Sequence, residues 1–275
     1  MSGLAGRGPP GETTQAVPFA EQTARLLREA RRALQPIEAL PGRLKPANLA
    51  EAYAVQRAFV AASGAKPVGY KVGLTSKLAQ EMLNADAPVW GTVTEESLRH
   101  SPAKLRAADF IFVAAEPEIA VVLANDLPPR EKAYSAEEVA EATARLHPAM
   151  EVVCSAYGEA WTRVGLFALA ADNGVHGCLV LGEGNDDWRG LDLPGLEVKL
   201  DVDGKFHSEG KGENALGGAM EVVAWLANAL PSEGLHLKAG EVITTGVVTG
   251  VPFLQAGQKA EARFEGLGAV KLLVE

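Results

Sequence analysis

The sequence predicts an α+β protein in which a mixed, rolled β core follows an N-terminal helical part. Three observations support this class. Residues 17–62 carry apolar side chains at helical spacing, most of the chain beyond residue 67 consists of short apolar runs broken by glycine turns, and few helical segments separate those runs. This pattern favours a rolled sheet over a doubly wound one, in which strands and helices alternate. A chain of 275 residues is long enough to bury one large core.

The N-terminal region divides into a tail and a helical part. Residues 1–16 are rich in Gly, Pro and polar side chains and lack the apolar core of a signal peptide, so we expect a disordered tail. Residues 17–66 form the helical part, with helices at 17–34 and 47–62, the second capped by Asn48. Prolines that cannot continue a helix interrupt the chain between the two, at Pro36, Pro41 and Pro46.

Residues 67–275 are expected to form one β-roll domain. Its strands are expected at residues 68–72, 110–123, 151–156, 167–171, 177–181, 196–202, 205–208, 241–248, 259–264 and 269–274. Its helices are expected at residues 76–83, 135–146 and 218–230. Asp203-Gly204 is a strong hairpin turn, and Ser135 with Glu138 forms a capping-box pattern at a helix start.

Composition and charge exclude several classes of partner. The net charge of −9 and the absence of a long basic run argue against a nucleic-acid groove. No apolar run reaches transmembrane length, so no membrane segment is expected. Cys154 and Cys178 lie in apolar surroundings without CxxC spacing, which predicts buried free thiols in a reducing compartment. The expected location is therefore the cytoplasm.

Several well-known catalytic motifs are missing from the sequence. It contains no GxxxxGK[ST] phosphate loop, no GxGxxG after a strand, no GxSxG elbow and no HExxH. The five histidines are scattered, which argues against a histidine-rich metal site. His176, between Val175 and Gly177, is expected to be a packed or loop histidine rather than a ligand.

Two carboxylates open an apolar run at Glu116-Pro117-Glu118. Side chains alternate across a strand, so Glu116 and Glu118 share one face, and Glu151 opens a second apolar run in a similar way. Like charges on a half-buried face are costly unless something neutralises them. A hard divalent cation with oxygen ligands is one solution. The alternative is a solvated strand face on which the acids pair with Lys or Arg.

Lys71 lies inside an apolar strand between Gly69 and Gly73. Glycines at such positions permit close approach of a ligand to the backbone. A lysine there can pair with a substrate carboxylate, or act as an acid–base group once its pKa is lowered. The alternative is a surface lysine on an edge strand.

The motifs that contain these residues occur in a recognisable order, and with them the chain resembles the 2-keto-4-pentenoate hydratase and 4-oxalocrotonate decarboxylase group of the fumarylacetoacetate hydrolase superfamily. The resemblance runs from about residue 47 to the C-terminus. The motifs read Gly69-Tyr70-Lys71-Val72-Gly73-Leu74-Thr75-Ser76, Glu116-Pro117-Glu118-Ile119-Ala120, Met150-Glu151-Val152-Val153 and Ala171-Asp172-Asn173. Each is weak alone, but the ordered set is specific.

The resemblance implies both a fold and a chemistry. The fold is the mixed β-roll of the superfamily, with the catalytic domain at 67–275. Glu116, Glu118 and Glu151 match the family's ligands for Mg²⁺ or Mn²⁺, and Lys71 matches its active-site lysine. The implied substrate is a short, unsaturated 2-oxo acid, and the implied reaction is hydration through a metal-stabilised enolate. The resemblance also implies a homo-oligomer.

Decarboxylation of 2-oxo-3-hexenedioate and hydrolysis of an acylpyruvate remain alternative reactions. Hydrolysis would need a water positioned by a Glu–His pair, for which His147 and His176 are the only candidates near the motifs.

The substrate-binding residues implied by the resemblance are Leu74, Val89, Asp172, Asn173, Val175 and Thr245. Val89 departs from the acid that the hydratases carry after the proline, and an aliphatic residue there is typical of the decarboxylases. The segments 174–176, 217–220 and 245–252 match neither branch. The pocket for the substrate tail is therefore expected to differ from both, and the natural substrate to be a different 2-oxo acid.

Overall fold

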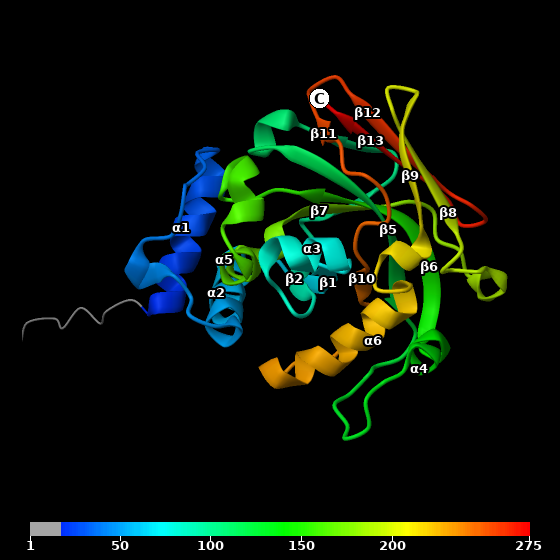
Figure 1. The fold of residues 1–275 in the computed structure, drawn as a ribbon, viewed down its shortest axis with the longest axis horizontal. Coiled ribbons are helices and arrows are strands. Elements are labelled where there is room, and N and C mark those ends of the chain that lie inside the picture. Colours follow the sequence, from blue (N-terminus) through cyan, green and yellow to red (C-terminus); the bar gives the residue numbers. More distant parts are fainter. Residues whose placement is uncertain (1–17) are drawn as a thin grey trace, which may run out of the picture.

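Two mixed sheets form the centre of the computed structural model, which describes residues 18–275 (Figure 1). The larger sheet contains β1 (Pro67–Gly73), β2 (Val89–Thr94), β3 (Leu98–His100), β5 (Val113–Leu123), β6 (Thr143–Val153), β7 (His176–Leu181), β10 (Val242–Thr244) and β11 (Phe253–Leu254). Its strands lie in the order β2-β1-β10-β5-β6-β7-β3, and β11 pairs with β5 outside that path. The predicted rolled, mixed sheet is therefore confirmed.

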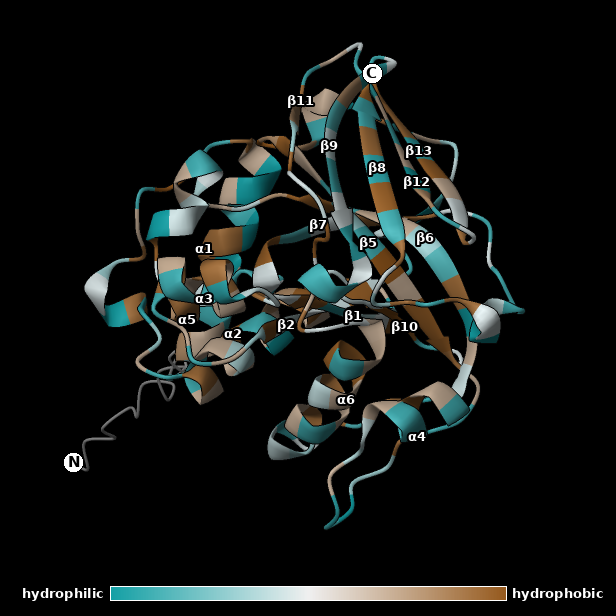
Figure 2. Ribbon diagram, turned by 45° about the vertical axis from the view of Figure 1, so that its right-hand side comes forward, coloured by the Kyte–Doolittle hydropathy of each residue, from teal (hydrophilic) through white to brown (hydrophobic). Residues whose placement is uncertain are grey.

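The smaller sheet packs against the larger one where β13 approaches β6 and β7. It contains β4 (Ala103–Leu105), β8 (Glu197–Val202), β9 (Lys205–Lys211), β12 (Lys259–Phe264) and β13 (Gly268–Val274), in the order β4-β13-β12-β8-β9. Buried and exposed residues alternate along the first four positions of β8, as its coloured bands show (Figure 2). The predicted β8–β9 hairpin is confirmed, and both of its turn residues, Asp203 and Gly204, have positive φ.

The helices flank the sheets in two groups. They are α1 (Phe19–Ala33), α2 (Leu49–Ala61), α3 (Lys77–Leu83), α4 (Ala136–Glu141), α5 (Leu166–Ala171) and α6 (Ala219–Ala229). α1, α2 and α5 pack together at one end of the molecule, while α4 packs on α6 beside β5 and β6 (Figure 1). The predicted Asn48 cap is confirmed, since its side chain accepts a bond from the Glu51 amide at 2.9 Å. No helix within residues 18–275 is long and apolar enough to cross a membrane.

The expected tail at residues 1–16 lies outside the described residues, and the division of the chain at residue 66 stays a prediction. The two cysteines, Cys154 and Cys178, are buried and free, as predicted.

The predicted helix at 135–146 is too long. Its capping box forms, because Ser135 and Glu138 bond each other's backbone amides, but the helix ends at Glu141. β6 begins at Thr143 and pairs with β5 almost throughout its length. Pro148 disfavours helix only at His147, which lies beyond the predicted end, so the proline did not reveal that the helix stops at Glu141.

The predicted strand at 167–171 is wrong, since these residues belong to α5. Leu169, Ala170 and Ala171 are buried and α5 packs on α2. Periodicity does not separate a short apolar strand from a short buried helix, and the alanines favour helix. The predicted strand at 241–248 is also too long. It pairs only over Val242–Thr244, because the chain turns away at Gly246, where φ is +94°.

A buried ion pair connects the N-terminal helices to the sheet. Arg31, at the end of α1, bonds Asp172 Oδ1 at 2.8 Å through Nε. Its two remaining nitrogens donate to the carbonyls of His176 at 2.6 Å and Asp172 at 2.7 Å. The second carboxylate oxygen of Asp172 accepts from the Ser155 hydroxyl and the Ala156 amide, each at 2.8 Å. α1 thereby fixes the short segment that leads into β7.

Replacing Arg31 should lower stability far more than replacing an exposed arginine on the same helix. Arg31→Met leaves the fully buried Asp172 without its partner, and breaking such a pair costs about 3–5 kcal/mol. Arg25→Met, whose side chain is 72 % exposed, should change stability by no more than about 0.5 kcal/mol. Urea denaturation measures both values. Equal losses for the two variants would contradict the anchoring role of Arg31.

Candidate metal centre

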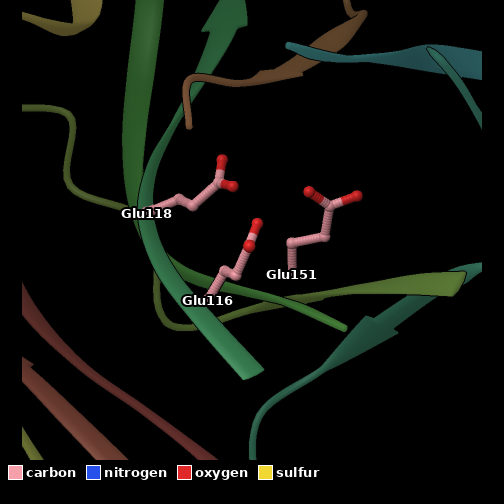
Figure 3. A group of neighbouring side chains, drawn as sticks. All are labelled: Glu116, Glu118 and Glu151. Carbon is pink, nitrogen blue, oxygen red and sulfur yellow. The ribbon is translucent and has the colours of Figure 1, made fainter. Parts of the chain in front are cut away.

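Three carboxylates meet on one face of the larger sheet. Glu116 and Glu118 alternate along β5, and Glu116 lies directly opposite Glu151 on β6. One carboxylate oxygen from each lies within 4.8 Å of the others, and Figure 3 shows the three groups pointing into a common space. Glu118 and Glu151 are fully buried and Glu116 is partly buried. The alternative of a solvated strand face is therefore wrong.

The hydrogen bonds of Glu118 leave one oxygen unused. Its Oε2 accepts from the Gly246 amide at 2.6 Å and from the Thr244 hydroxyl. Its Oε1 is buried and has no hydrogen-bond partner among the described residues. An unpartnered buried carboxylate oxygen is costly, so this atom has an open position for a ligand.

Lys71 is the cation that faces the three acids. Its Nζ lies 3.1 Å from Glu151 Oε2, and the residue is only 3 % exposed. β1 lies between β2 and β10, so the alternative of a surface lysine on an edge strand is wrong. Gly69 permits this arrangement, because a Cβ there would lie 1.9 Å from the Val242 carbonyl oxygen and would force β10 away.

Burial and mutual repulsion shift the pKa values of the acids. Burial raises the pKa of Glu116 to about 7. The positive charge of Lys71 lowers this pKa in part, and the repulsion of Glu151 adds to the rise. Burial, then Glu151 and Glu116, raise the pKa of Glu118 well above its usual value. Burial would also raise the pKa of Glu151, but Lys71 and His176 more than offset it and leave that pKa lowered.

Lys71 keeps its charge in this setting. Burial alone would lower its pKa, but the facing carboxylates, Glu151 first, raise the pKa above its usual value. Of the two roles open from the sequence, the structure favours the paired ammonium over an acid–base group with a lowered pKa.

A pocket opens beside the carboxylates and has Lys71 and Glu116 in its lining. Its empty space is about 550 Å³, a figure that includes the solvent at its open mouth. Three of the predicted substrate-binding residues, Leu74, Val89 and Val175, line it. The lining also includes Gly174, Gly246 and Val247, from two of the three segments that the sequence tied to the substrate tail, but no residue of the third, 217–220. Lining residues that the sequence did not single out for this role are Thr75, Ser76, Ala79, Val153, Trp161 and Leu169.

The other three predicted substrate-binding residues do not line this pocket in the described part of the chain. Asp172 is occupied by Arg31, Ser155 and Ala156. Asn173 exchanges two bonds with the Thr92 backbone, at 2.8 and 2.9 Å, and thereby holds β2. The Thr245 hydroxyl donates to the Ile119 carbonyl at 2.7 Å. These side chains support the walls of the pocket.

His176 contacts the carboxylate cluster, which its place in the sequence did not predict. As expected it is a packed histidine, 4 % exposed, but its Nδ1 lies 2.8 Å from Glu151 Oε1. His147 hydrogen-bonds the Gly182 carbonyl through Nδ1 at 2.9 Å and not an acid of the cluster.

The donor set fits a hard divalent cation. All candidate ligand atoms are carboxylate oxygens, which suit Mg²⁺, Ca²⁺ and Mn²⁺, and one of them lacks a protein partner. Because the pocket adjoins Glu116, an ion held here would lie within reach of a ligand in the pocket.

Comparison with known proteins gives a consistent result. The family model described as fumarylacetoacetate (FAA) hydrolase C-terminal matches residues 66–275. The chain is 34% identical to 2-hydroxyhexa-2,4-dienoate hydratase of Comamonas testosteroni over 213 residues, 77% of this chain and 79% of that protein. It is 32% identical to 2-keto-4-pentenoate hydratase of Paraburkholderia phymatum over 254 residues, 91% of this chain and 95% of that protein.

Among solved structures, the chain is similar to 4-oxalocrotonate decarboxylase from Pseudomonas putida G7 complexed with magnesium and adipate. The TM-score is 0.86 at 26% identity, with 93% of this chain and 97% of that chain covered. The same decarboxylase has been solved with calcium and acetate.

Replacing Glu116 with Gln should have opposite effects in the absence and presence of metal. Without metal the variant should be more stable than the wild type at neutral pH, because the Gln amide carries no charge that has to be buried beside Glu151. With Mg²⁺ the wild type should gain thermal stability and Glu116→Gln should gain little. Melting curves with EDTA and with Mg²⁺ measure both effects. Glu209→Gln, at an exposed position, serves as the control. If Mg²⁺ raises the melting temperature of Glu116→Gln as much as that of the wild type, Glu116 is not a ligand.

The metal-free stability should also depend on pH through Glu116. The pKa of Glu116 is about 7 in the folded protein and about 4.5 in the unfolded chain. The protonated carboxyl therefore favours the folded state below about pH 4.5, and this contribution is lost as the pH rises to about 7. The stability of the wild type relative to Glu116→Gln should therefore fall between about pH 4.5 and 7. Denaturation in EDTA across this range tests the sign. A stability difference between the wild type and Glu116→Gln that is constant or rises with pH would be inconsistent with a raised pKa of Glu116.

Proposed function

This chain belongs to the fumarylacetoacetate hydrolase family, and we propose that it is a divalent-metal-dependent lyase, a hydratase of short unsaturated 2-oxo acids such as 2-keto-4-pentenoate. The observation that carries the proposal is the pocket lining, which contains Lys71, one acid of the carboxylate cluster (Glu116) and several apolar side chains. This arrangement matches a substrate with one charged end and an uncharged tail.

We propose that Glu116, Glu118 and Glu151 hold the metal, either Mg²⁺ or Mn²⁺. Their oxygen-only donor set and the unpartnered Oε1 of Glu118 support this assignment. When bound, the ion would act as a Lewis acid that stabilises the enolate of a 2-oxo acid.

Lys71 would supply the positive charge that the protein itself contributes to the reaction. Its ammonium lies against Glu151 and lines the pocket, so it can hydrogen-bond the carboxylate of an anionic ligand without leaving Glu151. Because its pKa is raised, it would hold its proton at neutral pH and act as a fixed donor. Apolar side chains among the lining residues, such as Val89 and Val175, would lower the local dielectric and strengthen this interaction.

The tail end of the pocket favours a monocarboxylate. Lys71 and Glu116 are the charged side chains among its lining residues, and Lys71 is the single cation. A second substrate carboxylate would lie against Val89, Leu169 and Val175 without a charged partner, which is costly. Thr75, Ser76 and Trp161 are the neutral lining residues with a polar side-chain atom, and the Trp161 indole N–H has no hydrogen-bond partner among the described residues.

Decarboxylation of 2-oxo-3-hexenedioate is the second candidate. Val89 lines the pocket, as the resemblance to the decarboxylases implies, and cannot position a water molecule. Acylpyruvate hydrolysis is less well supported. The described structure does contain a Glu–His pair, Glu151 and His176, but His176 is absent from the described pocket lining and so presents no nitrogen to a water there.

Parallel assays separate these candidates. Purified protein with Mg²⁺ is given 2-hydroxypenta-2,4-dienoate, 2-hydroxyhexa-2,4-dienoate and 2-oxo-3-hexenedioate, with ultraviolet absorbance and CO₂ release followed together. We expect loss of dienoate absorbance without CO₂, and turnover of the hexadienoate because its methyl tail meets an apolar wall. Release of CO₂ from 2-oxo-3-hexenedioate would show that the protein is a decarboxylase. No turnover of any of the three compounds would point to another 2-oxo acid.

Replacing Lys71 should separate turnover from metal binding. Lys71→Met removes the donor that faces the substrate carboxylate and should lower kcat/KM by roughly 100-fold or more. Mg²⁺ affinity should hold or rise, because a positive charge 3.1 Å from Glu151 is removed. Steady-state kinetics and calorimetry measure the two effects, with the exposed Lys77→Met as control. Undiminished turnover in Lys71→Met would refute the proposed role.

The resemblance also implies a homo-oligomer in the cytoplasm, which we retain as part of the proposal. Leu78 and Met82 on α3, beside the pocket, are 69 % and 61 % exposed, and such large apolar side chains favour burial against another surface. Light scattering after size exclusion tests this, and a monomer at micromolar concentration would contradict it.

A further inference from the structure

The turn that leads into β7 brings an unexpected histidine to the carboxylate cluster. We infer that His176 is a positioning residue that sets the orientation of Glu151 through a hydrogen bond. The inference rests on the proposed metal site, and it concerns a residue outside the ligand set.

A β-bulge places the imidazole on the face of the sheet that carries the acids. Glu151 pairs with Leu179 and Val152 with Cys178, but Val153 pairs with His176, so Gly177 is an extra residue. Without the bulge His176 would face the opposite side, since side chains alternate along a strand. Only glycine fits at the bulge, because a Cβ on Gly177 would lie 2.6 Å from the Val152 carbonyl oxygen.

The hydrogen bonds of His176 define its ring orientation at both nitrogens. Nδ1 lies 2.8 Å from Glu151 Oε1, and a carboxylate oxygen only accepts, so Nδ1 carries the proton. Nε2 lies 3.0 Å from the Ser97 hydroxyl, which can donate to it when the imidazole is neutral. Arg31 fixes the backbone of the same residue through its bond to the His176 carbonyl at 2.6 Å.

The two carboxylate oxygens of Glu151 therefore have different partners. Oε1 is held by His176 and Oε2 faces Lys71 at 3.1 Å, so the carboxylate plane cannot rotate freely. Partners of this kind commonly affect metal affinity by 10–100-fold, because they orient a ligand that would otherwise sample several rotamers. His176 is absent from the described pocket lining, so it acts through Glu151 rather than on a substrate.

Two substitutions separate the hydrogen bond from packing. His176→Leu fills a similar volume but cannot donate, whereas His176→Asn retains an N–H group near the position of Nδ1. Mg²⁺ affinity, measured by calorimetry on folded metal-free protein, should fall by about 10–100-fold in the Leu variant and remain near the wild-type value in the Asn variant. KM for the 2-oxo acid should rise more than kcat falls when Mg²⁺ is limiting, and saturating Mg²⁺ should restore activity.

Other outcomes would overturn the inference. Unchanged Mg²⁺ affinity in His176→Leu would show that Glu151 needs no such partner, while the proposed function would stand. A wild-type protein that binds no Mg²⁺ would instead overturn the proposed metal site, and the inference with it. ¹⁵N NMR of the metal-free protein gives a readout that needs no variant to fold: Nδ1 should be protonated, and an imidazole protonated only at Nε2 would refute the hydrogen bond to Glu151.

Discussion

The arrangement of three buried carboxylates around a single lysine is the constraint on which the rest of the structure depends. Three acids face one ammonium on this sheet, so ionising all of them would bury an excess of negative charge, and burial raises the pKa values of Glu116 and Glu118 accordingly. The protein offsets part of this cost with the Gly246 amide, the Thr244 hydroxyl and the His176 imidazole. The unpartnered Oε1 of Glu118 supports our proposal that a cation completes the site.

The elements around the cluster serve to hold it open toward one pocket. Gly69 lets β10 approach β1, and Gly91 lets the Asn173 carbonyl approach β2, since a Cβ at either glycine would lie within 2.3 Å of a backbone oxygen. α2 fixes β2 through Gln56, which bonds the Trp90 carbonyl at 2.9 Å beside Val89. α1 fixes the segment before β7 through Arg31. The N-terminal helices therefore shape the walls of a pocket whose chemistry lies in the family-matched region.

The three carboxylates and Lys71 could be predicted from the sequence, but the hydrogen bond between His176 and Glu151 could not. Alternation along a strand was enough to place Glu116 and Glu118 on one face, and the ordered motifs added Glu151 and Lys71. The contact between His176 and Glu151 was not predicted, because it depends on a bulge at Gly177 that leaves no local pattern in the sequence. The resemblance implied that Asp172 binds substrate, but its carboxylate is bonded to Arg31, which is distant in the sequence, and to Ser155 and Ala156. α5 was mistaken for a strand because its burial comes from packing on α2, which local sequence does not record.

The most direct measurement is a crystal structure of the protein soaked with Mn²⁺ and recorded at a wavelength where manganese scatters anomalously. The account predicts one strong anomalous peak among the carboxylates of Glu116, Glu118 and Glu151, at coordination distance from an oxygen of each and facing the pocket that contains Lys71. An empty cluster, with the three acids still together and manganese bound elsewhere, would contradict it.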